Sequence, residues 1–488
     1  MSSLFKQYGW FLVIFLFYVY VTNPLNAQLP SNTALGFDSH IFAIIGYLWQ
    51  RGYVPYRDIF DEKGPVIYVI NTLGFFIHDD NLLGIYAVEL VFLFFTLFFI
   101  FRTLKDDLLS VCASLFMLPT LCLMLFDNSE GGNMTEEYTA LFAVLSVYLY
   151  SARRPTSDHL RLALYGVLGA LAFLTKLNMA FMPLVMFMME LFRTRKPSSV
   201  LYCALGFTLA TLPFVVYFYL KGALWDFYET YIVFNIFYLN HSGASIYQML
   251  FPALQYHPAL FACFAILLRL IYLHRPRRDF ILSVLLLSLC LVLCVGSGKL
   301  WNHYFVIFLG PLLILLYLIR EPLKLILSQL LTILMPEFCR RLLTPIVICI
   351  TLLAALAVQY YTIFEHDEYS REVEQLHSIG MNASSSIAIR DAHFKPLSIF
   401  YKIKALPSQR MLYTPPGDDR AAVLPGASHI LSCSELHDFD FVITALEKCL
   451  DEERFERIGT YFGAGLYKRR PAAMRTESSG SLQGDLSP

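Results

Sequence analysis

Carboxylates and ammonium groups gather in a few polar stretches of a chain that is otherwise strongly apolar. The first stretch, from Asn23 to about His78, contains Asp38, Arg57, Asp58, Asp61, Glu62 and Lys63. The second, DNSEGGNMTEEY, contains Asp127, Glu130, Asn133, Glu136 and Glu137. Isolated polar residues follow: Lys176, and then Lys299 and His303 in SGKLWNHYF. Because a charge near a bilayer is costly, such clusters indicate a functional site.

These residue types fit a reaction between a lipid phosphate and a polar acceptor. An aspartate at the start of a helix can remove a proton from a hydroxyl group. Cations at the bilayer surface can hold a departing phosphate and neutralise its charge. The candidate catalytic acids are Asp38, Asp61, Glu136 and Glu137. The candidate phosphate-binding groups are Lys63, Arg57, Lys176, Lys299 and His303. A divalent cation is a possible cofactor, with Asp38, Asp127 and Glu136 as candidate oxygen ligands.

Each candidate also has a purely structural interpretation, which the sequence leaves open. Asp38 is a favoured residue for a helix N-cap, and Arg57 can pair with Asp58 in a turn. Glu136 and Glu137 follow Thr135, where a helix dipole favours acids. The Lys176 side chain can extend to the interface with no further role. A lone histidine such as His303 is by default a hydrogen-bonded core residue.

The composition is that of an integral membrane protein. Of the 488 residues, 57% are hydrophobic and only 15% are charged, whereas soluble domains have about 25% charged residues. The mean hydropathy is +0.55. The formal net charge of −1 provides no basic excess for nucleic acid, which is not an expected partner.

Apolar runs predict about eleven membrane-spanning helices. The runs are Trp10–Val21, Leu82–Phe101, Leu108–Phe126, Tyr138–Tyr150, Leu162–Thr175, Met179–Phe192, Val200–Leu220, Phe251–Leu273, Phe280–Val295, Tyr304–Ile319 and Leu343–Ile363. The region Leu162–Phe192 is either two short helices broken near Lys176 or one long tilted helix. The first run is interpreted as an uncleaved membrane helix.

The charge distribution predicts that the N-terminus is cytoplasmic. If Lys6 is inside and the spans alternate, the basic clusters all fall on the cytoplasmic side, as the positive-inside rule requires. These clusters are Arg102 and Lys105; Arg153, Arg154 and Arg161; Arg193, Arg195 and Lys196; Arg275, Arg277 and Arg278; and Arg320, Lys324, Arg340 and Arg341. The polar stretches with the candidate site residues then share the extracytoplasmic face.

Three segments are too short or too polar to span a bilayer comfortably. Asp38–Arg51 and Pro65–Ile77 are predicted to be interfacial helices in the first outer loop, and Pro322–Leu334 a third on the cytoplasmic side. The alternation and turn signals after His366 predict a small extracytoplasmic α/β domain at 364–470, after a transmembrane domain at 1–363. Residues 471–488 form a Ser- and Gly-rich tail predicted to be disordered. Cys433 and Cys449 can form one disulfide if their region is extracytoplasmic.

The motifs GFDSHIF, GYVPYRDIFDEKGP, GGNMTEEY and HYF, in this order, resemble the GT-C superfamily of polyprenyl-phosphate-sugar-dependent glycosyltransferases. The branch that they resemble contains bacterial relatives of protein O-mannosyltransferases and of the lipid A aminoarabinose transferase. By this resemblance Asp38 is the acid at the start of the first interfacial helix, and Lys63 is the cation near the lipid phosphate. Glu136 and Glu137 match the second acidic motif, and His303 a polar residue near the donor.

The resemblance implies an inverting transferase in a bacterial inner membrane, with its site on the periplasmic or extracellular face. Its donor would be a polyprenyl-phosphate sugar, and its acceptor a hydroxyl group of a glycan, lipid or protein. Ser39 stands where relatives often have Glu, which bears on any metal requirement. A lipid-linked polysaccharide polymerase or ligase, and a transporter or flippase without chemistry, are the alternatives. Sequons at Asn133, Asn240 and Asn382 also leave an endoplasmic reticulum location open.

Overall fold

The fold is described from a computed structural model. It describes residues 9, 11–16, 18–19, 37–79, 82–105, 109–110, 113, 132–152, 158–236, 246–296, 300, 302–334, 375–382, 384–385, 387–390, 440–444, 450, 454–461 and 464–470. Most of the predicted span Leu108–Phe126, all of Leu343–Ile363 and the predicted tail lie outside these ranges. Asp127, Lys299, Cys433 and Cys449 lie outside them as well.

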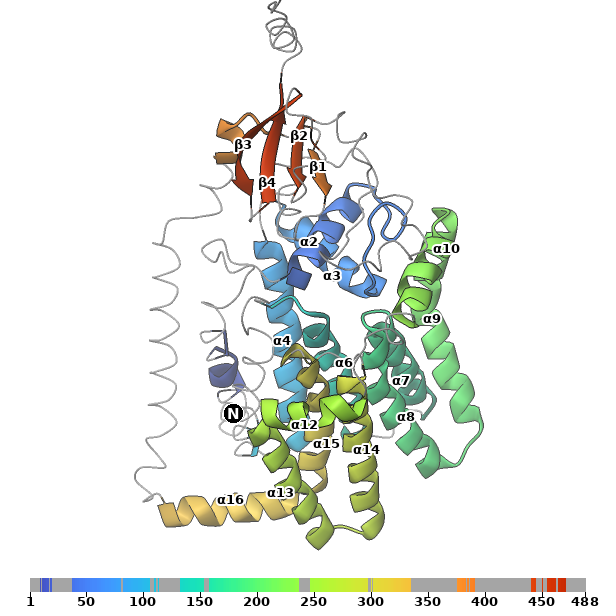
Figure 1. Cartoon of the computed structure of the whole chain (residues 1–488). Helices are drawn as coiled ribbons and strands as arrows, with labels where there is room; N and C mark the ends of the chain where they lie inside the picture. The colour runs from blue at the N-terminus through green and yellow to red at the C-terminus, as the bar shows by residue number, and fades with distance from the viewer. Residues whose placement is uncertain are drawn as a thin grey trace, which may run out of the picture.

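Long apolar helices form the body of the protein (Figure 1). Of the helices in the described ranges, α4 (Leu83–Leu104), α9 (Ser198–Leu220) and α14 (Arg277–Val295) are long and apolar enough to cross a bilayer. Counting two bent helix pairs as one span each raises this number to five. The protein is thus mostly helical and polytopic, whereas the total of about eleven spans and the N-in orientation remain predictions.

Most of the other membrane-region helices coincide with the predicted runs. They are α6 (Thr135–Ala152), α7 (Asp158–Phe173), α8 (Phe181–Thr194), α12 (Ile246–Tyr256), α13 (Pro258–His274) and α15 (Leu309–Leu318), with the short η2 (Leu177–Ala180), α10 (Leu224–Phe227), η3 (Tyr228–Val233) and η4 (Asn302–Phe308). Of the two alternatives for Leu162–Phe192, the structure has the broken one, since α7 ends before Lys176 and α8 begins after it.

The predicted run Phe251–Leu273 is not one helix. α12 and α13 meet at a bend of 93°. His257 has φ −131° and ψ 62°, because the ring of the following Pro258 excludes helical geometry at the residue before it. Pro258 then begins α13, where its missing N–H has no partner to lose.

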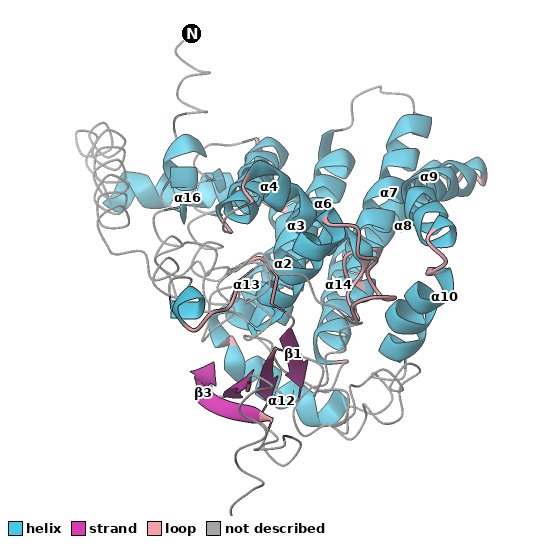
Figure 2. Ribbon diagram, turned by 90° about the horizontal axis from the view of Figure 1, so that it is seen from above, coloured by secondary structure: helices cyan, strands magenta, loops and turns pink. Residues whose placement is uncertain are grey.

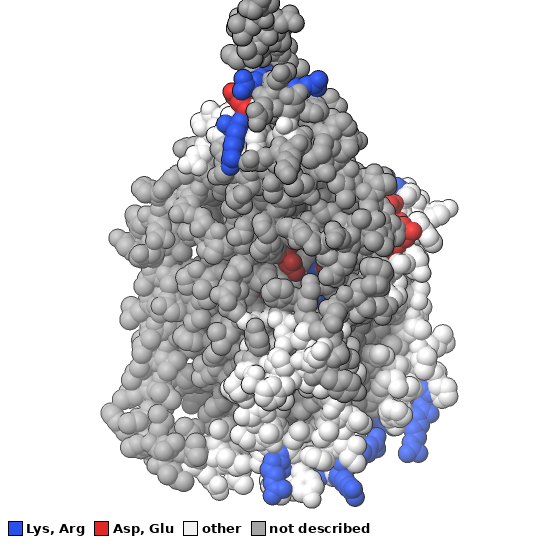
Figure 3. Space-filling view, viewed as in Figure 1, with Lys and Arg blue, Asp and Glu red and all other residues white. Residues whose placement is uncertain are grey.

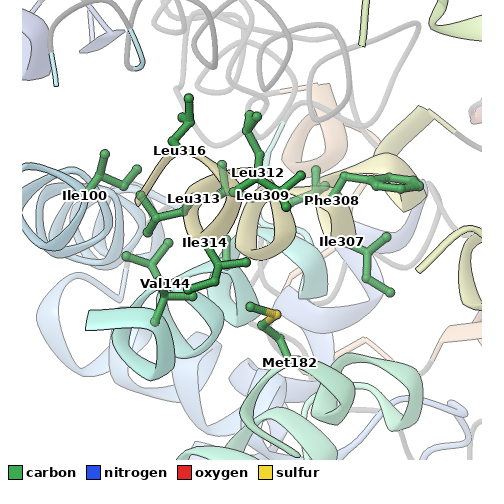
Figure 4. Packing of buried hydrophobic residues seen from close by; sticks show 14 of the residues in the cluster. Ile100, Val144, Met182, Ile307, Phe308, Leu309, Leu312, Leu313, Ile314 and Leu316 are labelled. Carbon is green, nitrogen blue, oxygen red and sulfur yellow. The ribbon is translucent and has the colours of Figure 1, made fainter. Parts of the chain in front are cut away.

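The helix α15 forms the centre of the main hydrophobic core. Figure 4 shows its side chains packed against helices on several sides. Leu313 and Ile314 are fully buried beside Val144 of α6, and Ile100 of α4 and Met182 of α8 belong to the same cluster. This core joins α4, α6, α8 and α15 into one bundle.

Two short helices lie across one end of the bundle, as the sequence predicts. α2 (Phe37–Gln50) packs on α3 (Pro65–Ile77), and α3 packs on α4. Figure 2 shows them from above, over the bundle. α16 (Arg320–Leu334), which contains the third predicted interfacial segment, turns away from α15 by 76° at the opposite end (Figure 1).

The C-terminal part contains a mixed four-stranded sheet in the order β1-β2-β4-β3. β1 (Ile387–Arg390) pairs in parallel with β2 (Phe441–Thr444), while β4 (Ala464–Arg469) is antiparallel to β2 and to β3 (Phe455–Tyr461). Phe441 and Leu466 belong to the same buried cluster as α2 and α3. The sheet is therefore on the α2–α3 end of the protein (Figure 1); its boundaries as a separate domain remain a prediction.

Candidate active site

The loop between α2 and α3 is folded tightly around two tyrosines. Tyr56 has a left-handed backbone, with φ 70°, and its hydroxyl group donates to the carbonyl oxygen of Lys63 at 2.8 Å. The Tyr68 hydroxyl group donates to Oδ2 of Asp61 at 2.7 Å. Asn235 holds the loop from outside, donating to the carbonyl oxygen of Glu62 at 2.7 Å. These bonds fix the backbone that carries Glu62 and Lys63.

Lys63 is placed between two carboxylates. Its Nζ contacts Glu62 and lies 4.0 Å from Oδ2 of Asp38, at the start of α2. Burial lowers the pKa of Lys63, but the Glu62, Asp38 and Asp61 carboxylates outweigh burial and raise this pKa well above its usual value. The Lys63 ammonium group is therefore charged. The Asp38 side chain keeps 31% of its surface exposed, against 13% for Lys63, so Asp38 is the more accessible of the two.

A backbone junction connects this loop to the end of α7. The Gly64 N–H donates to the Thr175 carbonyl oxygen at 3.1 Å, and the Val66 N–H to the Leu174 carbonyl oxygen at 3.0 Å. A Cβ atom on Gly64 would lie 1.9 Å from the Leu174 oxygen, so only glycine allows this approach. The junction brings the residues that follow Lys63 against the residues that precede Lys176, although the two segments are far apart in sequence.

Lys176 pairs with a fully buried carboxylate from α6. Its Nζ donates to Oε1 of Glu136 and lies 4.3 Å from the centre of the Tyr304 ring. Thr135 donates to Oε2 of Glu136 at 2.7 Å, and Nε2 of His303 is 4.0 Å from Oε1. Four elements, α6, η2, η4 and the end of α7, thus meet at one buried ion pair.

The two ion pairs belong to one site. The electrostatic environment of His303 includes Asp38 and Lys63 as well as Glu136 and Lys176. The structure therefore brings together five predicted site residues at the α2–α3 end of the bundle: Asp38, Lys63, Glu136, Lys176 and His303.

A buried amide network beneath this site was not found by sequence reasoning. The side-chain amides of Asn71 on α3 and Asn133 before α6 bond to each other in both directions, at 2.8 and 3.2 Å. Asn133 also donates through Nδ2 to the Ser39 carbonyl oxygen at 3.1 Å and through its backbone N–H to Glu89 of α4. A lone Glu89 within an apolar helix and an asparagine before Met-Thr-Glu-Glu were the available signals. The network ties the start of α6 to the residue after Asp38.

The other predicted candidates make different contacts. Arg57 donates to Asp58 at 2.8 Å and to the Lys221 carbonyl oxygen at 2.8 Å, so the predicted structural pair with Asp58 is confirmed. Asp61 is only 4% exposed, and burial together with Glu62 raises its pKa well above the usual value. Glu137 is buried in the first turn of α6, where Glu89 belongs to its electrostatic environment. Lys299 and Asp127 are outside the described residues.

The carboxylates of the site face ammonium groups. Within the described ranges no three His, Cys, Asp or Glu side chains are grouped as a metal-binding set. Glu136 is bound by Lys176, and Asp38 faces Lys63. These two metal-ligand candidates therefore do not form a divalent-cation site by themselves; a cation that also uses Asp127 remains a prediction.

The fold and the site define a class: a polytopic membrane protein whose interfacial helices cover a site of paired lysines and carboxylates. No family model matches the sequence, and no curated protein matches it. Solved structures, however, resemble the fold of this chain. ArnT from Cupriavidus metallidurans bound to undecaprenyl phosphate has a TM-score of 0.58 at 13% identity, over 95% of this chain and 98% of that chain. The apo state gives 0.57 at 12% identity, over 94% and 96%.

A third solved structure is more distant. The Archaeoglobus fulgidus oligosaccharyltransferase, in complex with Zn and sulfate, has a TM-score of 0.42 at 13% identity, over 91% of this chain and 68% of that chain. The likeness to ArnT extends over nearly the whole of both chains. It confirms, at the level of the fold, the resemblance that the sequence motifs predict.

Proposed function

We propose that this protein is a membrane glycosyltransferase that moves a sugar from a polyprenyl-phosphate carrier to an acceptor hydroxyl group, with inversion at the anomeric carbon. The observation that carries the proposal is the presence of two half-buried lysines, each paired with a carboxylate, at the same end of the bundle as the partly exposed Asp38. The ArnT structure with bound undecaprenyl phosphate shares this fold and supports a lipid of this class as the donor.

The two lysines are suited to the lipid phosphate. Each ammonium group has three N–H donors. Glu62 takes up one donor of Lys63, and Glu136 takes up one of Lys176. The remaining donors can bind phosphate oxygens, and a charged donor strengthens each bond. The paired carboxylates hold the cations in place before the donor binds.

Asp38 is suited to act as the base. Its carboxylate is separated by 4.0 Å from Lys63 and is partly exposed, so an acceptor hydroxyl group can reach it. In the transfer, the acceptor oxygen forms a bond to the anomeric carbon while the bond from this carbon to the phosphate oxygen breaks. The acceptor proton passes to Asp38, and the negative charge that develops on the departing phosphate is stabilised by Lys63 and Lys176.

Location follows from the same proposal. The α2–α3 end, with the sheet, would face the periplasm or cell exterior of a bacterial inner membrane, and the basic loops would face the cytoplasm. The acceptor would be a glycan, lipid or protein that reaches this face.

The test uses purified full-length protein in detergent with a panel of radiolabelled undecaprenyl-phosphate monosaccharides. Release of undecaprenyl phosphate is measured with membrane extract as the acceptor source. Asp38→Asn should lower the release rate by about 10²–10⁴-fold, while Asp79→Asn, which changes a surface pair with Arg51, should not. Near-wild-type release by Asp38→Asn would remove Asp38 from the mechanism. Transfer of a long glycan in one step would favour a polymerase or ligase.

A further inference from the structure

A cavity lies at the end of the bundle remote from the candidate active site. Its volume is about 520 Å³, within the range of about 300–1,000 Å³ that small-molecule sites occupy. α8, α14 and α15 contribute most of its lining, with Tyr150 of α6. None of the groups assigned to sugar transfer lines it.

The inner wall of this cavity is apolar. Leu282, Leu285, Leu286 and Leu289 project into it from successive turns of α14, opposite Ile314 of α15. Leu285 and Leu289 are 59% and 43% exposed, so this wall is not closed by the protein's own side chains. A strip of leucines along a membrane helix suits a hydrocarbon chain that runs parallel to the helix.

The rim of the cavity contains two arginines. Arg275 at the end of α13 and Arg320 at the start of α16 both line it, and Arg320 lies over the Tyr317 ring at 4.5 Å. Two acids line the cavity as well. Asp279 is 3.6 Å from Arg275, and Glu321, whose side chain is 76% exposed, accepts a hydrogen bond from Nε of Arg320 at 3.2 Å. Both guanidinium groups thus keep donors for an additional anion.

The depth of the rim matches a lipid headgroup. The chain turns by 76° between α15 and α16, and Arg320 is the first residue of the helix that runs sideways (Figure 1). An amphipathic helix in this orientation lies along a membrane surface. Figure 3 shows lysine and arginine atoms gathered at the same lower end.

From the leucine wall and the two arginines at surface level, we propose that this cavity binds one anionic phospholipid of the adjacent leaflet. The phosphate group would lie between Arg275 and Arg320, and one acyl chain would follow the leucines of α14. Basic pockets between membrane helices are suited to anionic headgroups. This binding does not depend on the glycosyltransferase proposal.

The experiment is native mass spectrometry of the full-length protein in mild detergent, with phosphatidylglycerol or phosphatidylcholine added at equal concentration. Phosphatidylglycerol should bind about tenfold more tightly. Both lipids carry a phosphate group, but the choline cation of phosphatidylcholine cancels its charge and is repelled by the two guanidinium groups. The double variant Arg275→Gln/Arg320→Gln should lose this preference. The matched control is Arg277→Gln/Arg278→Gln, which changes two arginines close to Arg275 in the chain that do not line the cavity. This control should retain the preference for phosphatidylglycerol.

A third variant tests the cavity without changing charge. Leu289→Trp would fill the cavity and should lower the affinity for phosphatidylglycerol by about tenfold. The proposal is overturned if wild-type protein binds the two lipids equally. It is also overturned if the Arg277→Gln/Arg278→Gln control loses as much preference as the double variant, or if Leu289→Trp binds lipid like the wild type.

Discussion

Lys63 and Lys176 are half-buried cations, and each is held by a carboxylate. Of the two, Lys176 is the more tightly constrained, since Glu136 is wholly inaccessible and the Tyr304 ring covers the ammonium group. A pair of this kind stabilises the fold only as a pair, because a single buried charge without its partner is costly. Its structural and functional contributions can therefore be separated by substitution.

Lys176→Met should lower stability by about 3–5 kcal/mol, because it leaves Glu136 buried without its cation. The double variant Lys176→Met/Glu136→Gln removes both charges and should recover most of the loss. Undecaprenyl phosphate release should stay low in both variants, since neither provides a cation at this position. Melting temperature and release rate are measured side by side; recovery of release by the double variant would show that Lys176 acts only on the fold.

A pH dependence follows from Glu62. Burial alone raises the pKa of Glu62, but Lys63 and the hydrogen bonds that Glu62 accepts outweigh burial and lower this pKa to about 2. Because the folded-state pKa is below the usual value, the stability from this pair is complete above about pH 4.5 and lost as the pH falls toward about 2. The melting temperature of wild-type protein should thus fall more steeply over this acid range than that of Glu62→Gln. Parallel curves would contradict the assignment.

At the scale of elements, the site depends on a contact between the α2–α3 loop and the end of α7. Two backbone hydrogen bonds join Gly64 and Val66 to Leu174 and Thr175. The positions of both lysines are consequently set by the backbone.

Gly64→Ala should separate these elements, since the added methyl group meets the Leu174 carbonyl oxygen. Overpacking of this kind costs about 1–3 kcal/mol, and the displaced Lys63 should also weaken donor binding. Gly169→Ala on α7 is the matched control, because its Cβ atom would meet nothing nearer than Pro183 at 3.8 Å. Melting temperature and the donor KM are the measurements; equal values for the two variants would argue against a positioning role of this junction.

How far the sequence predicts this structure differs between elements. Pro65–Ile77 has the predicted bounds, because Pro65 at the first turn and the apolar residues up to Ile77 mark both ends locally. The prediction of one helix over Phe251–Leu273 is wrong. It followed the apolar composition of the segment and disregarded Pro258, which ends one helix and begins the next. The gathering of Asp38, Lys63 and Glu136 at one end follows from the predicted topology. The amide pair of Asn71 and Asn133 does not, since it depends on the register between helices that are distant in sequence.

At the scale of the whole molecule, the candidate site and the basic turn between α13 and α14 lie at opposite ends of the bundle. The α2–α3 site and the sheet are at one end, and Arg275, Arg277, Arg278 and the start of α16 are at the other (Figures 1 and 3). A lipid donor that binds in one leaflet, together with basic loops on the cytoplasmic side, would require this arrangement.

The proposed orientation predicts which loops are accessible from outside. An epitope inserted at Asn382, which is exposed next to the sheet, should bind antibody in right-side-out vesicles. An epitope inserted at Pro276, between α13 and α14, should bind only after permeabilisation. The reverse result would invert the protein in the membrane and place the candidate site on the cytoplasmic side.

The Asn133 amide has a practical consequence for producing the protein. Asn133-Met134-Thr135 is a glycosylation sequon, yet the side chain is wholly enclosed and its nitrogen is bonded to Ser39 and Asn71. A secretory-pathway host that attached a glycan there during synthesis would prevent α2, α3 and α6 from closing together. Yeast or insect-cell expression should therefore yield misassembled chains unless the sequon is broken at Thr135, whereas a bacterial host avoids the problem.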